Sequence, residues 1–484
     1  MPRAGARGAR GGAGPRETWA VILAAGEGKR MRSAQPKILH RLGGQPLVRY
    51  PVALVQAAGM AGSVVVVAPG ADAVRAALAD LGARFVEQPT PRGTGDALRR
   101  AHPALPASAT EFVLLYGDVP LLAGATLDAL RARHHASRAA ATVLTFVPAD
   151  PTGYGRIRRG RDGRVRAIVE ERDATPAERR GRECNSGIYC FDPRRLWPAL
   201  EAVARPAPTN AQGEIYLTDV IAELTRRGSR VEAVRVADPL EVAGVNDRRQ
   251  LAALEALLRT RTLDALMTAG VSVIDPAATY VDTTVTVGRD TVLHPGVRLA
   301  GRTSIGEGCV IGMGSQLTDT AIGDRVTLRP YCVLDESKVE DDATLGPFAR
   351  LRRGSHIGSG AEVGNFIEIK QSTLGRRVKA HHVGYIGDAT VGDGANIGAG
   401  TVTCNFDGLR KHPTRIGARA FVGTNSSLVA PLTIGDDAYV GAGSVITRDV
   451  PAGALATERA PQEVKEGWTE RRRSRQTAEG GPPA

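Results

Sequence analysis

The chain has 484 residues, a formal net charge of +12 and aromatic side chains at only 4% of positions. This length predicts two or three domains, and the basic excess suits phosphorylated small-molecule substrates. The scarcity of aromatic side chains argues against a base-stacking surface for nucleic acid. No apolar run reaches the ~18 residues of a membrane span, so we expect no membrane insertion.

Both ends of the chain are basic. Residues 1–16 hold four arginines and no acid, and the far end carries Arg471, Arg472, Arg473 and Arg475. Such runs are usually solvated and disordered, so we expect tails over residues 1–17 and 461–484; contact with RNA or a membrane surface is the alternative. The first segment also has no apolar core before Trp19, which argues against a secretory signal.

The five cysteines are odd in number and form no CxxC pair. This usage is typical of a reduced, cytoplasmic protein and argues against a structural zinc site.

The first predicted strand is the apolar run over residues 20–23, and a glycine-bearing loop follows it at residues 24–28. A strand that enters such a loop allows backbone N–H groups to face a phosphate. The loop is neither a GxGxxG fingerprint nor a Walker loop, and an ordinary β-turn is the alternative interpretation.

Helical and strand patterns then alternate. Helices are predicted over residues 47–59 and 72–81 and from residue 93 onward, and strands over 63–68, 84–86 and 112–116. This alternation predicts a mostly parallel sheet with helices on both faces, whose ligands lie at the carboxyl ends of the strands. Gly26 and Asp118 both follow strands, so we expect one crevice to hold them. Asp118 would be a hard oxygen ligand for Mg²⁺; a turn or helix-capping role is its alternative.

Further strands are predicted over residues 142–147 and 164–169 and from Asn185, with a turn over residues 153–156. Asn246 and Asp247 are placed to cap a helix that runs to about residue 269, with leucines along roughly one face and Gly270 to end it. At 1.5 Å per residue this helix would span ~30 Å and would serve as a rigid connector.

From residue 285 to 450 an aliphatic residue returns every six positions, usually followed by glycine. The three runs are Val287, Leu293, Leu299, Ile305 and Ile311; Val339, Leu345, Leu351, Ile357, Val363 and Ile369; and Ile416, Val422, Leu428, Ile434, Val440 and Ile446. A period of six fits neither a helix nor a single strand and predicts a coil of short strands, a β-helix. The period fails between residues 402 and 416, and a loop let out of a regular solenoid usually serves binding.

Several longer motifs point to a known family. Residues 23–40 read LAAGEGKRMRSAQPKILH, with YGD at 116–118, GYGR at 153–156 and GVN at 244–246, and these resemble the sugar-phosphate nucleotidyltransferases. The repeat carries NFIEIK at 365–370, HHVGYIGDA at 381–389 and CNFDG at 404–408. Together, over residues 18–468, the two sets resemble the bacterial bifunctional GlmU family, which makes UDP-N-acetylglucosamine from glucosamine-1-phosphate.

The resemblance implies an α/β, Rossmann-like nucleotidyltransferase domain over residues 18–246 and a helical linker over 247–269. A left-handed parallel β-helix of hexapeptide repeats, the acetyltransferase domain, would follow over residues 270–460. It also implies UTP, acetyl-CoA and sugar phosphates as substrates, Mg²⁺ as the metal, and a homotrimer with acetyltransferase sites between subunits.

For uridylyl transfer the resemblance implies a site that binds the nucleotide, the sugar and a metal. Its binding residues would be Leu23, Ala24, Ala25, Gly26, Lys37, Gln88, Gly93, Thr94, Tyr116, Gly117, Asp118, Gly155, Glu170, Asn185 and Asn246. Asp118 and Asn246 would ligate Mg²⁺. The sugar phosphate is already an anion, so the reaction needs charge neutralisation and in-line placement, which Mg²⁺, Lys37 and Arg30 would supply. Lys29 replaces a usual threonine, with an effect that the pattern leaves open.

For acetyl transfer the resemblance places the general base at His382, because an imidazole titrates near working pH and takes the proton of the attacking amine. Glu368 would orient or polarise the pair formed by His382 and the amine. Glucosamine-1-phosphate would meet Arg352, Lys370, Tyr385 and Asn396, and acetyl-CoA would meet Ala399, Asn405, Phe406, Thr424, Ala442 and Arg459. Residue type alone leaves Arg352 and Lys370 open to being a solvated basic face, and Glu368 to being a surface acid.

The family pattern differs at two places in this half. Phe406 replaces a usual tyrosine and puts one hydrogen bond in doubt, and His381 replaces a usual glycine or asparagine, so only the motif selects His382 over its neighbour. Cys404 is assigned no catalytic role.

Two other functions are compatible with parts of the chain. One is a monofunctional sugar-phosphate nucleotidyltransferase whose β-helix only assembles the oligomer, against which His382, Lys370 and Asn405 argue. The other is a non-catalytic solenoid scaffold with a degenerate N-terminal domain, against which the presence of Lys37, Asp118 and Asn246 argues.

Overall fold

The computed structural model describes residues 17–26, 28–205 and 210–478, and the chain divides into two compact units after Arg261. The basic tail predicted over residues 1–17 lies, except for its last residue, outside this described part. Within the described residues, no helix has both the length and the apolar character that crossing a membrane requires.

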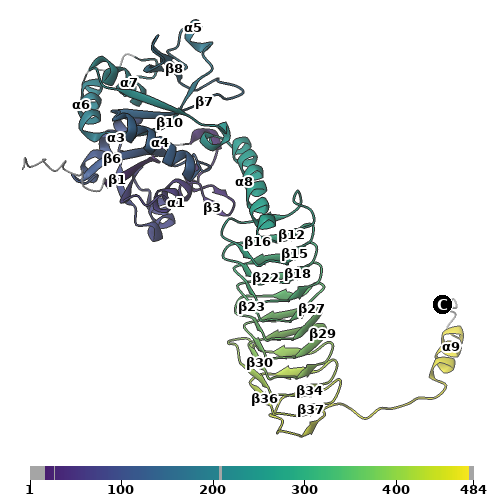
Figure 1. Ribbon diagram of the computed structural model, residues 1–484. Coiled ribbons are helices and arrows are strands. Elements are labelled where there is room, and N and C mark those ends of the chain that lie inside the picture. The colour runs from purple at the N-terminus through teal and green to yellow at the C-terminus, as the bar shows by residue number, and fades with distance from the viewer. Residues whose placement is uncertain (1–16, 27, 206–209, 479–484) are drawn as a thin grey trace, which may run out of the picture. The chain divides into compact units, whose positions relative to one another are not determined.

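The first unit is built on a twisted sheet with the strand order β11-β7-β10-β6-β1-β4-β5 (Figure 1). Its strands are β1 (Glu17–Leu23), β4 (Gly62–Val67), β5 (Arg84–Glu87), β6 (Ala109–Tyr116), β7 (Ala141–Phe146), β10 (Cys184–Phe191) and β11 (Val231–Arg235). Strands β1, β4, β5 and β6 run parallel, as predicted. Strand β10 runs antiparallel to both β6 and β7, a direction that the sequence pattern did not predict.

Helices cover both faces of this sheet because successive side chains of each strand point to opposite sides. The helices are α1 (Arg49–Ala57), α2 (Asp72–Ala77), α3 (Thr94–Ala101), α4 (Gly124–Ser137), α5 (Pro176–Arg179), α6 (Pro193–Ala204) and α7 (Leu217–Arg226). Ala20 and Ile22 of β1 pack in one core with side chains of α1, α2 and α4. Trp19 and Val21 pack in the other with side chains of α3, α6 and α7. The predicted α/β architecture is therefore confirmed.

Short elements complete the first unit. The hairpin of β8 (Arg156–Arg159) and β9 (Val165–Val169) joins the sheet through pairing of Arg156 with Cys184 of β10. Strands β2 (Arg41–Leu42) and β3 (Gln45–Pro46) form a separate hairpin. The 3₁₀ helices η1 (Lys29–Met31) and η2 (Lys37–Leu39) follow β1 and carry the cationic part of the first motif.

Helix α8 (Arg248–Thr268) begins and ends where the sequence predicted. The carboxylate of Asp247 accepts the backbone N–H groups of Arg249 and Gln250, both at 2.9 Å, which is the capping interaction expected of an aspartate at this position. Gly270 adopts a left-handed φ of +96°, a conformation that favours glycine after a helix. The division between the two units falls within this helix.

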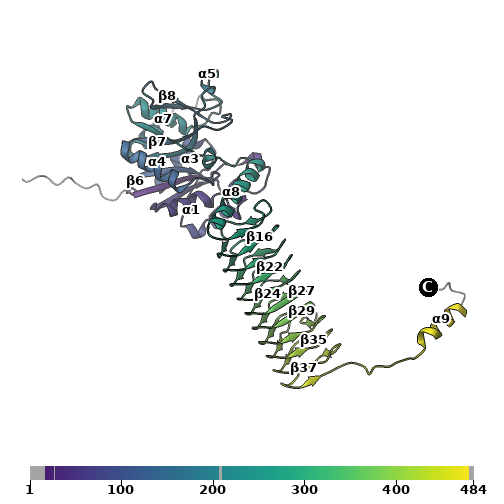
Figure 2. The same cartoon turned by 45° about the vertical axis from the view of Figure 1, so that its right-hand side comes forward.

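The second unit is a three-sided parallel β-helix, and Figure 2 shows its short strands stacked coil upon coil. The first face holds β12 (Ser272–Val273), β15 (Val292–Leu293), β18 (Val310–Ile311), β21 (Thr327–Leu328), β24 (Thr344–Leu345), the first part of β27 (Glu362–Lys370) and of β29 (Lys379–Gly387), β31 (Asn396–Ile397), β34 (Phe421–Val422), β37 (Tyr439–Val440) and β39 (Leu455–Ala456). The second face holds β13 (Tyr280–Val281), β16 (Arg298–Ala300), β19 (Gln316–Thr318), β22 (Val333–Asp335), β25 (Arg350–Leu351), the second part of β27 and β29, β32 (Val402–Cys404), β35 (Ser427–Val429) and β38 (Val445–Ile446). The third face holds β14 (Thr286–Val287), β17 (Ser304–Ile305), β20 (Ala321–Ile322), β23 (Lys338–Val339), β26 (His356–Ile357), β28 (Thr373–Leu374), β30 (Ala389–Val391), β33 (Thr414–Ile416) and β36 (Leu432–Ile434).

The six-residue repeat forms the core of this β-helix. Leu293, Ile311, Leu328, Leu345 and Val363 are register partners in successive coils of the first face, and all are buried. Every residue of the three predicted runs belongs to this core except Val287, which packs against it half-buried. One inward aliphatic residue for each strand explains the period, because each coil contributes one strand to each of three faces.

The predicted interruption is also present. The chain leaves the coil after Cys404 and rejoins it at Thr414, and Phe406 and Lys411 form an isolated antiparallel bridge within the intervening segment. We call residues 405–413 the protruding loop.

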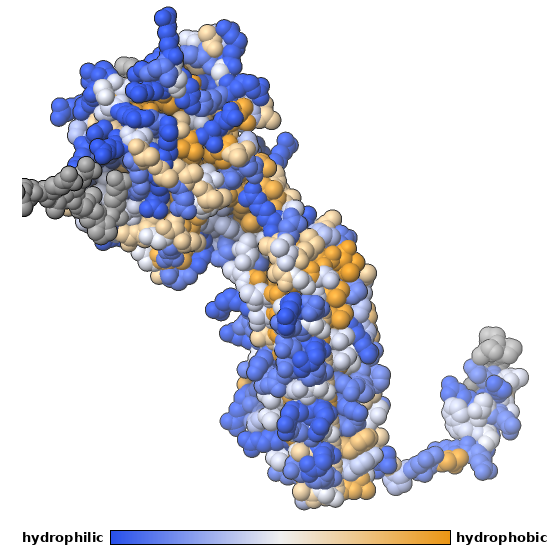
Figure 3. Space-filling model, in the orientation of Figure 1, coloured by the Kyte–Doolittle hydropathy of each residue, from blue (hydrophilic) through white to orange (hydrophobic). Residues whose placement is uncertain are grey.

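The basic C-terminal run differs from the expectation of a disordered tail. Helix α9 (Trp468–Ala478) contains Arg471, Arg472, Arg473 and Arg475, and all its side chains are exposed. The guanidinium of Arg472 lies over the Trp468 ring at 5.1 Å from its centroid, a cation–π contact across the first turn. Figure 3 shows this helix as predominantly hydrophilic.

Candidate active sites

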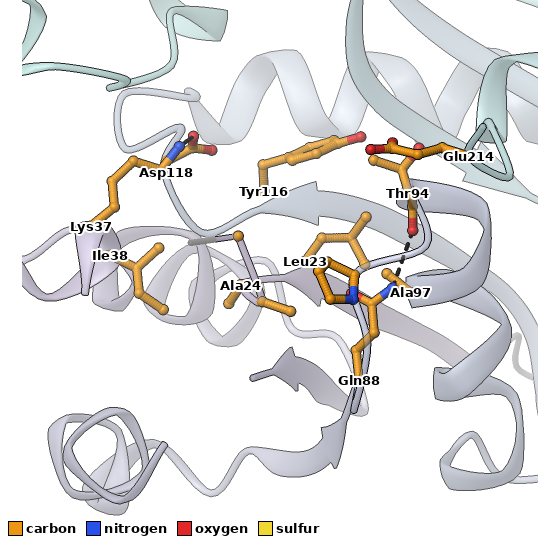
Figure 4. Close-up of a pocket in the computed structure, with 14 residues that line it drawn as sticks. Leu23, Ala24, Lys37, Ile38, Gln88, Thr94, Ala97, Tyr116, Asp118 and Glu214 are labelled. Atoms are coloured by element: carbon orange, nitrogen blue, oxygen red, sulfur yellow. Dashed lines mark hydrogen bonds and ion pairs between the residues drawn. The ribbon is translucent and has the colours of Figure 1, made fainter. Parts of the chain in front are cut away.

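A pocket of about 280 Å³ opens at the carboxyl ends of β1 and β6 in the first unit (Figure 4). It is lined by Leu23, Ala24, Ala25, Gly26, Lys37, Ile38, Gln88, Pro91, Gly93, Thr94, Ala97, Tyr116, Asp118 and Glu214. The loops after the two strands lie side by side, because Gly117 donates its N–H to the carbonyl of Leu23 at 2.9 Å. The structure therefore brings together most of the residues predicted to bind the nucleotide.

Two cations and two oxygen-bearing side chains meet at one end of this pocket. The Nζ of Lys37 pairs with the Oδ2 of Asp118 and lies 3.4 Å from the Oδ1 of Asn246. The guanidinium of Arg30 donates to the same Asn246 oxygen at 2.9 Å. Asp118 and Asn246 thus aim their oxygens at one cation position, which is the donor set that a hard divalent cation takes.

Glycine is required at residue 28, where the loop over residues 24–28 passes Lys37. Gly28 has a left-handed φ of +62°, and a Cβ atom built on it would lie 2.5 Å from the Cβ of Lys37. The loop after β1 therefore reaches η2 closely only because residue 28 has no side chain.

The other end of the pocket is organised by α3. The amide of Gln88 donates to the Asp96 carboxylate at 2.9 Å and to the carbonyl of Gly93 at 3.2 Å. Gly93 has a φ of +99°, and a Cβ there would come within 2.7 Å of the carbonyl oxygen of Ile215. These contacts hold Gln88, Gly93 and Thr94 along one wall of the pocket, where the resemblance predicts that they bind the nucleotide.

The residues predicted for the sugar form a separate group. Asn185 donates its backbone N–H to the carbonyl of Gly155 at 2.9 Å, and Glu170 accepts the Thr218 hydroxyl at 2.9 Å. Burial raises the pKa of Glu170, and neighbouring carboxylates act in the same direction. Burial, with the charges of Glu170 and Asp118, also raises the pKa of the Tyr116 phenol, which keeps it a neutral hydrogen-bonding group beside the pocket.

A second pocket, of about 260 Å³, lies at the corner between the first and second faces of the β-helix. It is lined by Arg329, Thr344, Gly346, Pro347, Glu362, Val363, Gly364, Asn365, His381 and His382. The two histidines have different partners there. His381 lies with its Nε2 2.8 Å from Glu362 Oε2, whereas the Nδ1 of His382 lies 3.1 Å from Asn365 Oδ1. Within the described chain nothing hydrogen-bonds to Nε2 of His382, so this nitrogen is free to meet a substrate.

The strands approach each other unusually closely at this corner. A Cβ atom built on Gly364 would lie 1.7 Å from the carbonyl oxygen of His381, which no packing can accommodate. Gly364 therefore permits the register in which Asn365 and His382 face each other.

We expect Gly364→Ala to lower kcat for acetyl transfer about 100-fold, because a shift of about 1 Å in a catalytic group has this effect. Uridylyl transfer by the same preparation should stay at the wild-type rate. Gly124→Ala is the matched control, since Gly124 does not have a left-handed φ and its added methyl group would lie 4.0 Å from the nearest atom. Equal rates of acetyl transfer in the two variants would contradict the steric argument.

A basic cluster lies on the second face beside this corner. Arg352 pairs with Glu368 at 2.8 Å, and the Nζ of Lys370 lies 3.3 Å from both oxygens of Asp388. Tyr385 is the register partner of Glu368. The prediction that Glu368 orients His382 does not match this geometry, because Glu368 stands three register positions away and its carboxylate holds Arg352.

Two residues of this cluster, Asp388 and Lys411, were not predicted. The amide of Asn405 in the protruding loop donates to Tyr385 Oη at 3.3 Å and to the Asp388 carboxylate, so Asp388 joins the loop to Lys370. The neighbouring Lys370 side chain lowers the pKa of Lys411, which lies in the same loop. Asp388 belongs to the HHVGYIGDA motif and Lys411 to the segment that interrupts the repeat. Only the fold shows that both lie near Lys370.

Three of the residues predicted for acetyl-CoA, Ala399, Thr424 and Ala442, follow one line along the same corner. Ala380, Ile397, Val422 and Val440 are register partners in successive coils. Two positions after each of them stand His382, Ala399, Thr424 and Ala442, in that order. Arg459 donates to the carbonyl of Ala442 at 2.9 Å, and Asn396 lies between Lys379 and Phe421 on the first face. Phe406 is 59% exposed on the protruding loop, while Asn405 is buried.

Comparison with known proteins assigns the two halves. A family model described as "MobA-like NTP transferase domain" matches residues 20–273, and one described as "Bacterial transferase hexapeptide (six repeats)" matches residues 284–319 and 413–448. Fold and sites together define a nucleotidyltransferase fused to a hexapeptide-repeat acyltransferase.

Several relatives cover both halves. The chain is 48% identical over 453 residues to "Bifunctional protein GlmU" of Heliobacterium modesticaldum, covering 94% of this chain and 98% of the relative. Proteins of the same name from Pelotomaculum thermopropionicum and an Anaeromyxobacter species are 49% and 48% identical, covering 94% and 96% of this chain and 99% and 95% of the relatives. The chain belongs to the bifunctional GlmU family, which confirms the resemblance predicted from its motifs.

The two activities of this enzyme are N-acetylation of glucosamine-1-phosphate from acetyl-CoA and uridylyl transfer from UTP to N-acetylglucosamine-1-phosphate, which together make UDP-N-acetylglucosamine. A nucleotidyltransferase with a purely structural β-helix is the less supported function.

Proposed function

We propose that uridylyl transfer takes place in the pocket at the strand ends, and acetyl transfer at the corner that carries His382. The observation that carries this assignment is the separation of chemistry: Lys37, Asp118 and Asn246 meet in the first unit, whereas His382 and Lys370 both belong to the second unit. The first group offers the charges that uridylyl transfer needs but no general base. The second offers a base for acetyl transfer but no metal ligands of the kind found in the first.

In the first site the nucleotide would lie between the loop over residues 24–28 and α3. Gln88, Gly93 and Thr94 would contact its base and ribose, and Lys37 and Arg30 would neutralise phosphate charge as the sugar phosphate attacks the α-phosphate. Gly155, Glu170 and Asn185 would hold the sugar. Because the attacking oxygen is already anionic, positioning and charge stabilisation supply the rate enhancement.

Asp118 and Asn246 would hold Mg²⁺, since both oxygens converge on one cation position. When bound, the metal would neutralise the charge of the triphosphate and of the departing pyrophosphate. Lys37 would then pair with phosphate instead of with Asp118.

In the second site Arg352 and Lys370 would bind the phosphate of glucosamine-1-phosphate, with Tyr385 and Asn396 on the sugar. The amine nitrogen of glucosamine-1-phosphate attacks the thioester carbonyl, and His382 Nε2 takes a proton from that nitrogen. The C–S bond then breaks, and the imidazolium returns the proton to the CoA sulfur. Ala399, Thr424 and Ala442 leave room along the corner for the donor, with Arg459, Asn405 and Phe406 at its border.

A homotrimer with acetyltransferase sites between subunits fits the flat faces of the β-helix, and all five cysteines are free, as suits a cytoplasmic enzyme. These assignments rest on the family pattern and on the parallel coils.

The wild-type protein should release pyrophosphate from UTP and N-acetylglucosamine-1-phosphate only when Mg²⁺ is present. Excess EDTA should stop the release, and added Mg²⁺ should restore it, because the Asp118–Asn246 site supplies the metal ligands. Acetyl transfer, measured as free CoA thiol in the same samples, should be unaffected by EDTA. Pyrophosphate release that persists in EDTA would contradict the metal assignment.

A further inference from the structure

His382 can act as a base only in one of its two neutral forms. A neutral imidazole carries its proton on either Nδ1 or Nε2, and the other nitrogen holds the lone pair. The hydrogen bond made by one nitrogen decides which form is present. The identity of the group that faces Nδ1 therefore decides whether Nε2 is basic.

That group is Asn365. Its Oδ1 lies 3.1 Å from Nδ1 of His382, and an amide oxygen accepts hydrogen bonds but donates none. The proton of the neutral ring is thus held on Nδ1, which leaves the lone pair on Nε2.

The contact is built into the backbone. Asn365 and His382 are register partners in the parallel pair of β27 and β29. They face each other across the close approach that Gly364 permits, where no Cβ would fit. Both side chains line the same corner pocket.

The other acceptors near the corner already have partners. The carboxylate of Glu362 lies 2.8 Å from the ring of His381, and the carboxylate of Glu368 pairs with Arg352. Within the described residues, Asn365 is the group that hydrogen-bonds to the His382 ring.

We propose that Asn365 is a positioning residue for acetyl transfer, which accepts the Nδ1 proton of His382 and so keeps the lone pair on Nε2, where the substrate amine delivers its proton. This inference rests on the proposed role of His382. On sequence alone, the Glu368 carboxylate is expected to orient the base. Here the neutral amide of Asn365 does so instead, and it fixes the tautomer of His382 without adding charge.

The test compares Asn365→Leu, Asn365→Asp and His382→Ala in the full-length protein with the wild type. Leucine has nearly the shape of asparagine but no acceptor, whereas aspartate keeps an acceptor toward Nδ1. We expect Asn365→Leu to lower kcat for acetyl transfer about 10- to 100-fold, a share of the usual effect of general-base catalysis. Its KM for glucosamine-1-phosphate should stay near the wild-type value, and Asn365→Asp should recover kcat to within about tenfold.

Each outcome is decisive. Wild-type kcat in Asn365→Leu, while His382→Ala is inactive, would overturn the role of Asn365 and leave the proposed function intact. An equal fall of kcat for acetyl transfer in Asn365→Leu and Asn365→Asp would also overturn this role. So would a higher KM for glucosamine-1-phosphate with an unchanged kcat. Acetyl transfer that is unchanged in His382→Ala would instead overturn the proposed function. Thermal unfolding and uridylyl transfer, measured on each preparation, separate these outcomes from loss of the fold.

Discussion

His382→Ala is expected to lower kcat for acetyl transfer by about 10²- to 10⁴-fold, the usual contribution of a general base. The amine of glucosamine-1-phosphate must lose a proton to complete its attack, and the described corner pocket offers His382 Nε2 for it. Acetyl transfer would be followed as release of CoA thiol, and uridylyl transfer as release of pyrophosphate. The second rate should stay at the wild-type value.

His381→Ala is the matched control for this change. It removes the same side chain one residue earlier, from a ring that Glu362 holds at 2.8 Å. We expect acetyl transfer within about threefold of wild type, the effect of removing one exposed ion pair of about 0.5 kcal/mol. If the two alanine variants lost activity equally, the choice of His382 as the base would be wrong.

Asp118→Asn should lower kcat for uridylyl transfer by about 10²- to 10³-fold, as removal of one strong electrostatic contact does in other active sites. The change keeps the shape of the side chain but removes the charge that pairs with Lys37 and would hold Mg²⁺. Because the substitution affects only the first unit, acetyl transfer should be unchanged. Pyrophosphate release across a range of Mg²⁺ concentrations is the measurement.

Asp128→Asn controls for the loss of one negative charge in the same domain. Asp128 lies on α4 with its side chain 69% exposed, and among the described residues its carboxylate makes only a 3.9 Å ion pair with Arg131. Its uridylyl transfer should match the wild type. A full rate in Asp118→Asn would show that this carboxylate is not needed for the reaction.

The architecture was predictable because its signals are local and repeated. An inward aliphatic residue returns in nearly every strand of the β-helix, with Thr403 as the exception in β32, so Leu345 and Val363 repeat the information of Leu293 and Ile311. The break in the period marked the protruding loop for the same reason. The antiparallel direction of β10 was not predictable, because its buried residues read the same in either direction.

The convergence of residues in the pocket of the first unit was predictable, since they follow strands whose ends meet at one edge of a parallel sheet. The contacts of His382 were less predictable. They depend on register and on the close approach at Gly364, and the side chain that faces His382 across the coils is Asn365, which was not singled out from the sequence. Lys411 reaches Lys370 only because the protruding loop folds back, which no short motif encodes.

The most direct test of two independent sites is complementation between the two inactive variants. Asp118→Asn and His382→Ala proteins would be supplied, separately and mixed, with glucosamine-1-phosphate, acetyl-CoA, UTP and Mg²⁺, and UDP-N-acetylglucosamine would be measured. Neither variant alone should form product at more than about one hundredth of the wild-type rate. The mixture should form it readily, because the first variant releases N-acetylglucosamine-1-phosphate and the second converts it. A mixture as inactive as its components would contradict the assignment of one reaction to each site.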